Sequence, residues 1–152
     1  MSESKFPSIS SSVCYRDPKA ALAWLEKAFG FEPAMVILGD DGSLMHSEMR
    51  FGDGMIMVGN EWSPDHRSPA NIGGKNTQTI HVQMDEGIDD HCERARAAGA
   101  EILQEPETQF YGDRAYRARD PEGHIWTFGQ TVEVMSSEAW DKVAGVTTKT
   151  RP

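Results

Sequence analysis

Cysteine, basic charge and long apolar runs are all scarce in this chain of 152 residues. Its two cysteines, Cys14 and Cys92, have neither the number nor the spacing of a disulfide framework or a zinc site, so we expect free thiols. Fifteen lysines and arginines against 24 aspartates and glutamates give a net charge of −9, which disfavours nucleic acid as a partner. No run of about eighteen apolar residues occurs and the N-terminus lacks a signal-peptide pattern, so we expect a cytoplasmic protein without a membrane partner.

The clearest pattern that the chain does contain is an internal repeat. Gly30 and Gly99 end two helical patterns and lie 69 residues apart, and the same offset separates the turn glycines Gly54 and Gly123. Two copies of one supersecondary unit, each too small to bury its own apolar face, are expected to pack together.

Each unit is predicted to have the element order βαβββ. In the first, residues 8–15 alternate as a strand with Ile9, Val13 and Tyr15 on one face, and Asp17 caps a helix that ends at Gly30. The further strands of this unit are predicted over 32–38, 44–51 and 55–58.

The second unit repeats this order after a connector rich in proline and glycine. Asp85 is predicted to cap its helix, whose buried stripe is Ile88, Cys92 and Ala95. Trp126 is expected in the core, and Trp140 is expected to face inward from a short final helix. The strands are predicted over 77–84, 101–103, 114–119 and 124–128. We therefore predict one domain, residues 1–152, with modules 8–59 and 77–130, a linker over 60–76 and a C-terminal helix at about 136–143.

Four short segments together resemble the vicinal oxygen chelate superfamily, which includes glyoxalase I, bleomycin-resistance proteins and ring-cleaving dioxygenases. The segments are Tyr15-Arg16-Asp17-Pro18, Ala28-Phe29-Gly30-Phe31, Ala97-Ala98-Gly99-Ala100-Glu101 and Asp120-Pro121-Glu122-Gly123-His124-Ile125-Trp126. The resemblance covers roughly residues 8–130. It implies an α+β fold in which two βαβββ modules form a curled mixed sheet around a funnel, usually in a homodimer, and a divalent metal in the catalytic members.

The family's metal ligands come from the first and last strand of each module. By this resemblance His81 is the only position that matches, and imidazole suits zinc, nickel or iron. The other positions lack a strong ligand: Thr127 where a glutamate is expected, Ser12 or Ser10, and Val58 with Met57 beside it. We therefore expect no cofactor and no metal in the usual place.

Two other kinds of chemistry stay open. His46 and Glu48 lie two apart on one strand face and could converge with His81 around a divalent ion, which makes His81 and Glu48 the candidate catalytic residues. The alternative is that His46, Glu48 and Arg50 form the polar face of a strand whose other residues, Met45, Met49 and Phe51, are buried. Cys14 could be a nucleophile across the funnel from His81, or an inert buried thiol. His66 and His91 are expected to be solvated.

Two functions follow from these observations. The first is a metal-free protein of the bleomycin-resistance type that sequesters a small organic ligand in the funnel as a homodimer. The second is a metal-dependent lyase or dioxygenase of the same superfamily that acts on vicinal oxygens of a small substrate. The expected ligand-binding residues are Ser10, Ser12, His46, Trp62, Gln83, Tyr111, Arg114, Tyr116 and Thr127.

Overall fold

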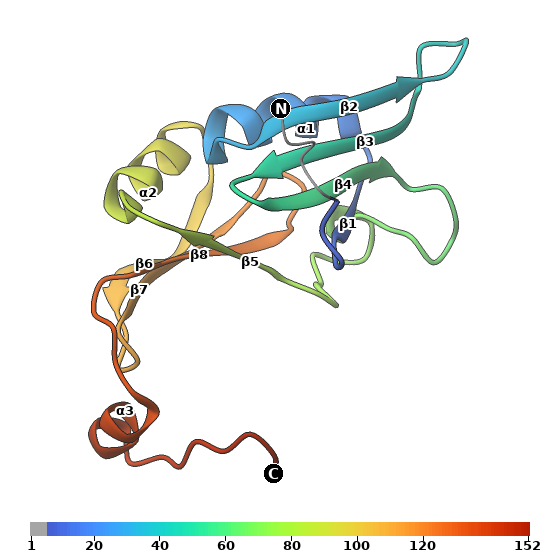
Figure 1. Cartoon of the computed structure of the whole chain (residues 1–152). Helices are drawn as coiled ribbons and strands as arrows, with labels where there is room; N and C mark the ends of the chain where they lie inside the picture. The colour runs from blue at the N-terminus through green and yellow to red at the C-terminus, as the bar shows by residue number, and fades with distance from the viewer. Residues whose placement is uncertain (1–5) are drawn as a thin grey trace.

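The structure, a computed structural model, describes residues 6–152 (Figure 1). The first half of the chain forms β1 (Ser11–Tyr15), α1 (Pro18–Phe29), β2 (Glu32–Leu38), β3 (Leu44–Phe51) and β4 (Gly54–Asn60). The second half forms β5 (Ile80–Met84), α2 (Ile88–Ala97), β6 (Glu101–Thr108), β7 (Asp113–Arg119), β8 (Ile125–Thr131) and α3 (Ser137–Ala144). A short 3₁₀ helix, Pro69–Asn71, lies in the linker. None of the helices within residues 6–152 is long and apolar enough to cross a membrane.

The strands form two four-stranded mixed sheets with the same order. The first sheet runs β1-β4-β3-β2 and the second runs β5-β8-β7-β6, with the first pair of each parallel and the others antiparallel. Both sheets are curled and neither closes (Figure 1). The predicted α+β class and the repeated βαβββ order are confirmed.

The ends of α1 follow the predicted chemistry, whereas the start of α2 does not. Asp17 Oδ1 accepts a hydrogen bond from the amide of Ala20 at 3.1 Å, and Gly30 ends the helix at φ 79°. The prediction that Asp85 caps α2 is wrong, because Gly87 is the cap residue and makes no side-chain cap. The Ile88 amide instead donates to Gln130 Oε1 at 3.0 Å, so a side chain from β8 takes over this role.

One aromatic core joins the two modules. Phe29 at the end of α1 lies 5.5 Å from Trp126 and 4.7 Å from Phe128, measured between ring centroids, and Phe31 lies 5.4 Å from Trp126. Helix α1 also packs on α2. The helices therefore cover one face of each sheet, and the predicted burial of Trp126 is confirmed.

His91 is a buried part of this core, so the expectation that it is solvated is wrong. Its Nε2 donates to the Phe29 carbonyl at 2.7 Å, and the Tyr116 hydroxyl donates to its Nδ1 at 2.5 Å. The histidine thus bonds a carbonyl of the first module to a hydroxyl of the second. Burial, followed by the Arg94 charge, lowers the His91 pKa against the opposing effect of the Phe29 hydrogen bond.

The turn Asp120-Pro121-Glu122-Gly123 fastens the second module to the start of α1. Asp120 is 4% exposed and accepts four hydrogen bonds, from the Tyr15 hydroxyl, the Trp126 indole and the amides of Glu122 and His124. Glu122 accepts from the amides of Arg16 and Asp17 at 2.7 and 3.0 Å. The acidic residues of this turn therefore satisfy donors at the junction of the two modules.

Three expectations about single side chains are wrong. Ile9 precedes β1, which begins at Ser11, and it is 90% exposed. Met45 is exposed because the β2–β3 pairing shifts register between Ile37 and Leu38, which breaks the alternation of β3. Trp140 is only half-buried, and no residue of α3 is buried.

Candidate functional site

Each sheet has one face covered by the helices and one open face, and several of the candidate residues lie on the two open faces. In the first sheet Ser12 lies opposite Met57, and Met57 lies opposite Glu48. In the second sheet His81 lies opposite Thr127. Ser12 and Met57 therefore occupy the positions in the first sheet that His81 and Thr127 occupy in the second.

This pairing settles which residues occupy the metal positions implied by the family resemblance. Ser12 is the first-strand residue, because Ser10 precedes β1 and its buried hydroxyl has no hydrogen-bond partner. The 69-residue offset between the modules makes Val58 the counterpart of Thr127, but Val58 is fully buried on the covered face. Met57, which lies opposite Ser12, therefore occupies this metal position instead. The four groups at these positions are two hydroxyls, a thioether and one imidazole.

These four groups do not fit a divalent metal. Zinc and its neighbours bind imidazoles, thiolates and carboxylates, whereas hydroxyls and a thioether are weak ligands for them. The one imidazole is also engaged, since His81 Nε2 donates to Gln83 Oε1 at 2.8 Å. The residues present therefore contradict a metal site of the usual family type.

The alternative site of His46, Glu48 and His81 is not assembled within one chain. His46 Nε2 donates to Glu48 Oε2 at 2.9 Å on the open face of the first sheet. Within the described part of the chain, only one group of three histidine, cysteine, aspartate or glutamate residues has its ligand atoms within 4.8 Å of one another. It consists of Cys92, Glu93 and Glu105. His81 does not join His46 and Glu48 in such a group.

A cavity of about 260 Å³ lies over the open face of the first sheet and brings together three of the predicted ligand residues, Ser12, His46 and Trp62. Trp62 reaches it from the linker, and its indole is stacked on the His66 ring with centroids 3.9 Å apart. Ser63 Oγ is hydrogen-bonded to His66 Nδ1 at 2.6 Å, which fixes the stacked pair. The remaining lining residues are Met45, Met57, Val58, Gly59 and Asn60.

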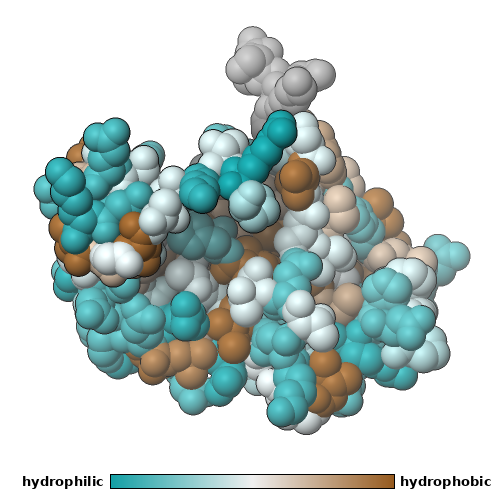
Figure 2. All heavy atoms as spheres, turned by 90° about the horizontal axis from the view of Figure 1, so that it is seen from below, coloured by the Kyte–Doolittle hydropathy of each residue, from teal (hydrophilic) through white to brown (hydrophobic). Residues whose placement is uncertain are grey.

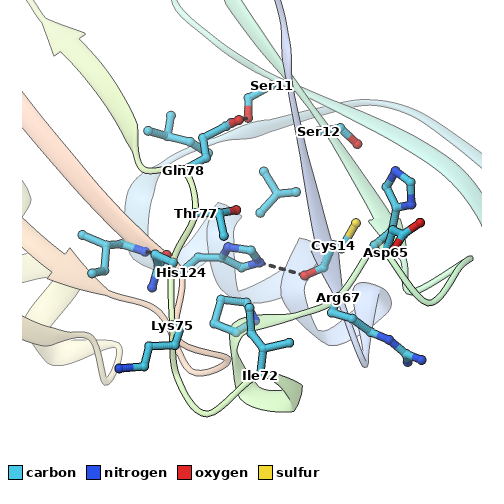
Figure 3. A pocket seen from close by; sticks show the side chains of 16 residues that line it. Ser11, Ser12, Cys14, Asp65, Arg67, Ile72, Lys75, Thr77, Gln78 and His124 are labelled. Atoms are coloured by element: carbon cyan, nitrogen blue, oxygen red, sulfur yellow. Dashed lines mark hydrogen bonds between the residues drawn. The ribbon is translucent and has the colours of Figure 1, made fainter.

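A second cavity, of about 180 Å³, lies between β1, the linker and the start of β8 (Figure 3). Ser12 borders both cavities, and His66 lines this one while Trp62 lines the other. The stacked pair therefore separates two neighbouring hollows. The surface seen from below is visibly hollowed near its middle (Figure 2).

Cys14 lines the second cavity but does not form a nucleophilic pair. Burial and then the charge of Glu61 raise the pKa of its thiol, which disfavours the reactive thiolate. Its carbonyl accepts a hydrogen bond from His124 Nε2 at 2.7 Å (Figure 3). His81 does not line this cavity, and its Nε2 is hydrogen-bonded to Gln83.

The structure does not bring the other predicted ligand residues to the cavity over the first sheet. For two of them, Tyr116 and Arg114, the prediction is wrong. Tyr116 is fully buried on the covered face, where burial raises its pKa. Arg114 lies on the same side and its Nε donates to Asp89 of α2 at 2.8 Å. Both are predicted to bind the ligand, but alternation along β7 places them under α2. Gln83 and Thr127 lie on the open face of the second sheet, and Tyr111 packs edge-on against Phe110 in the β6–β7 turn.

Sequence reasoning missed Met45, Met57 and His66 as neighbours of the ligand cavity. Met45 was assigned to the core by simple alternation, which the register shift overrides. The segment Trp62-Ser63-Pro64-Asp65-His66 contained a usable indication, because a serine-proline turn joins residues three apart, here Ser63 and His66, and so brings Trp62 near His66.

Comparisons with known proteins identify the family and the fold of this chain. A family model described as Glyoxalase/Bleomycin resistance protein/Dioxygenase superfamily matches residues 8–128. The crystal structure of TioX from Micromonospora sp. ML1 is 31% identical with a TM-score of 0.63, covering 81% of this chain and 97% of that one. An uncharacterized protein of Mycobacterium bovis is 29% identical over 136 residues, 87% of this chain and 88% of that protein. A glyoxalase/bleomycin resistance protein from Streptomyces sp. CB03234 shares the fold at 18% identity, with a TM-score of 0.60 over 80% of this chain and 97% of that one.

Proposed function

Because the chain belongs to the glyoxalase/bleomycin resistance protein/dioxygenase superfamily, we propose that it is a metal-free protein of the resistance type that sequesters a small organic molecule. The ligand occupies the cavity over the open face of the first sheet. Family membership alone cannot supply this function, since one fold hosts many activities, so the proposal depends on the residues of the cavity.

The observation that carries the proposal is the meeting of Ser12, His46 and Trp62 around one cavity. Trp62 is 67% exposed although it is stacked on His66, so a large face of the indole is free for a ligand. An indole beside the thioethers of Met45 and Met57 favours a flat, apolar ring system. Such a ring would stack on Trp62 and bury the two thioethers.

The polar end of the cavity favours a basic group on that ring. Glu48 has a side-chain exposure of 12% and holds the His46 imidazole, which lines the cavity. The protein as a whole carries a charge of −9, which attracts cations toward it. A planar aromatic amine is therefore the ligand class that this cavity fits best.

The alternative function, a metal-dependent lyase or dioxygenase, has one observation in its favour. The His46–Glu48 pair places an imidazole and a carboxylate 2.9 Å apart on an open face, which is a possible half-site. A third ligand such as His81 would have to come from another copy. This reading requires purified, untagged protein to carry close to one Zn, Ni, Mn or Fe ion per chain, and His81→Ala to remove it.

The proposal is tested by a thermal-shift screen of planar aromatic amines, followed by calorimetric titration of any compound that stabilises the protein. A compound present at 100 times its dissociation constant stabilises by about 2.7 kcal/mol, which is a readily measured shift. Trp62→Ala should weaken binding at least roughly tenfold, whereas Trp62→Phe, which keeps an aromatic face, should retain most of the affinity. A screen without hits, or a hit whose affinity ignores Trp62→Ala, would contradict the proposal.

A further inference from the structure

A third cavity, of about 450 Å³, lies between the start of α1 and the turn of the second module that contains Pro121. It is larger than the two cavities described above and shares no lining residue with either of them. A volume of several hundred cubic ångströms is enough to hold a small organic molecule. This cavity, called the α1 cavity below, is therefore a possible binding site separate from the one over the first sheet.

One wall of the α1 cavity is apolar and firmly held. Four residues on one face of α1 form it: Ala20, Ala21, Trp24 and Leu25. The Trp24 indole N–H donates to the Ala98 carbonyl at 2.8 Å, and its ring meets the Phe29 ring edge-on with centroids 4.9 Å apart. Leu25 is fully buried. A wall that is fixed before binding reduces the entropy that a ligand must lose.

The opposite wall is the turn of the second module, where Pro121 and Glu122 line the cavity. Glu122 ties this turn to the residues that precede α1. Its Oε2 accepts from the Asp17 amide at 3.0 Å, and its Oε1 accepts from the Arg16 amide and the Ser68 hydroxyl, both at 2.7 Å. Because the two walls are bonded to each other, the space between them is preformed.

The charge of the α1 cavity favours a cation. Three carboxylates line it, those of Asp17, Asp120 and Glu122, against the single guanidinium of Arg16, so the lining carries a net charge of −2 (1 − 3). The Arg16 side chain is 54% exposed, and its Nε lies 3.7 Å from Glu122 Oε1. A half-exposed guanidinium is screened by water and neutralises the three carboxylates only in part.

The hydrogen-bonding groups of the cavity also disfavour an anion. A helix start can bind an anion through free amides, but Pro18 has no N–H. The amides of Ala20 and Ala21 donate to Asp17 Oδ1 and to the Asp17 carbonyl, each at 3.1 Å. The Trp24 N–H is engaged as described above. In contrast, Asp17 Oδ2 accepts no hydrogen bond from any residue within 6–152, so an acceptor is open to a ligand.

We propose that the α1 cavity binds a small apolar amine as its ammonium ion. The ammonium group donates to Asp17 Oδ2 in a charge-assisted hydrogen bond, and the apolar body packs on Trp24 and Leu25. The walls are mostly aliphatic, so they suit a compact, rounded body, whereas the cavity over the first sheet offers the flat face of Trp62. This second site does not depend on the proposed function.

The test uses three probes with one rounded body and different charges, titrated by calorimetry into the full-length protein. The probes are adamantylamine, which is a cation at neutral pH, the neutral adamantanol, and the anion adamantanecarboxylate. Adamantylamine should bind at least roughly tenfold more tightly than adamantanecarboxylate, with adamantanol between them. No binding of the amine, or binding of the carboxylate that is equally tight, overturns the proposal.

Variants at the helix start separate charge from shape. Asp17→Asn removes the charge but keeps a side chain that caps helices equally well, so α1 should stay intact. It should weaken adamantylamine at least roughly fivefold and change adamantanol by less than about twofold. Ala20→Leu should fill the cavity and weaken both probes at least roughly tenfold. Ala23→Leu, at an exposed position of α1 that does not line the cavity, is the matched control and should leave both affinities unchanged.

Trp62→Ala shows whether the two sites are separate. It should leave adamantylamine binding unchanged, because Trp62 does not line the α1 cavity. Binding that Trp62→Ala abolishes, or that Ala20→Leu leaves intact, would place the amine elsewhere and overturn the proposal. Circular dichroism checks that each variant is folded. Failure of the planar aromatic amines to bind at Trp62 would leave this result untouched, so the two proposals fail independently.

Discussion

His81 and Thr127 lie directly opposite each other on the neighbouring parallel strands β5 and β8. Residues paired in this way project to the same face of a sheet, with their Cβ atoms about 5 Å apart. A histidine and a carboxylate at these two positions could grip one ion, but threonine offers only a hydroxyl. The missing carboxylate therefore accounts for the expected lack of a metal in this sheet.

Restoring that carboxylate should create a measurable metal site. Thr127→Glu is expected to raise the affinity for Zn²⁺ or Ni²⁺ at least roughly tenfold over wild type, because it adds a charged oxygen beside the His81 imidazole. Isothermal titration calorimetry measures this directly. Thr131→Glu is the matched control, since it places the same carboxylate on the same face at the far end of β8. Equal affinities of the two variants would show that the register argument fails.

The buried carboxylate of Asp120 should be one of the most sensitive positions for stability. Asp120→Ala leaves four donors without an acceptor, including the Tyr15 hydroxyl and the Trp126 indole, and should lower the free energy of unfolding by roughly 3–5 kcal/mol. Urea denaturation gives the value. Asp53→Ala, in the exposed β3–β4 turn, should change stability by no more than about 0.5 kcal/mol. Similar losses in the two variants would contradict the role assigned to Asp120.

His91 should make folding sensitive to mild acid. The pKa of His91 is lowered in the folded state, so below about pH 6.5 the unfolded chain binds a proton at this histidine more readily than the folded chain does. The free energy of unfolding therefore decreases as the pH is lowered. Denaturation at pH 7.5 and pH 5.5 should show this loss in wild type and a smaller loss in His91→Gln. His66→Gln, at a half-buried linker position, should behave as wild type does. An unchanged pH dependence in His91→Gln would rule out this histidine as the cause.

Gly112 should be far less replaceable than a turn glycine with free space around it. An added Cβ at Gly112 would lie 2.0 Å from the Glu133 carbonyl oxygen, and the residue has φ 93°. Gly52 also has positive φ, at 56°, but an added Cβ there meets nothing within 4 Å. Gly112→Ala should therefore cost about 1–3 kcal/mol more than Gly52→Ala in urea denaturation. Equal costs would mean that the backbone at Glu133 moves away from Gly112 easily.

The repeat made the fold predictable from sequence, because two matched glycine pairs revealed two copies of one unit. The cap at Asp17, the stop at Gly30 and the burial of Trp126 also followed from local chemistry. Features set by tertiary contacts did not. The Gln130 side chain that bonds the start of α2 comes from a strand 42 residues away, and nothing near Ile88 indicates it.

The candidate site was only partly predictable for a similar reason. Alternation alone placed Ser12 and His46 on open strand faces, where the structure has them. Strand parity did not predict the exposure of Met45, because a register shift changes the face on which it lies. It did not predict the burial of Tyr116 either, because that face of β7 lies under α2. The Trp62–His66 stack depends on how the linker turns, which no periodic pattern records.

The metal content of purified, untagged protein tests the central claim most directly. Inductively coupled plasma mass spectrometry should find Zn, Ni, Mn and Fe far below one ion per chain, in a sample that still binds a planar aromatic amine through Trp62. Close to one ion per chain, lost in His81→Ala, would contradict the claim and favour the metal-dependent enzyme.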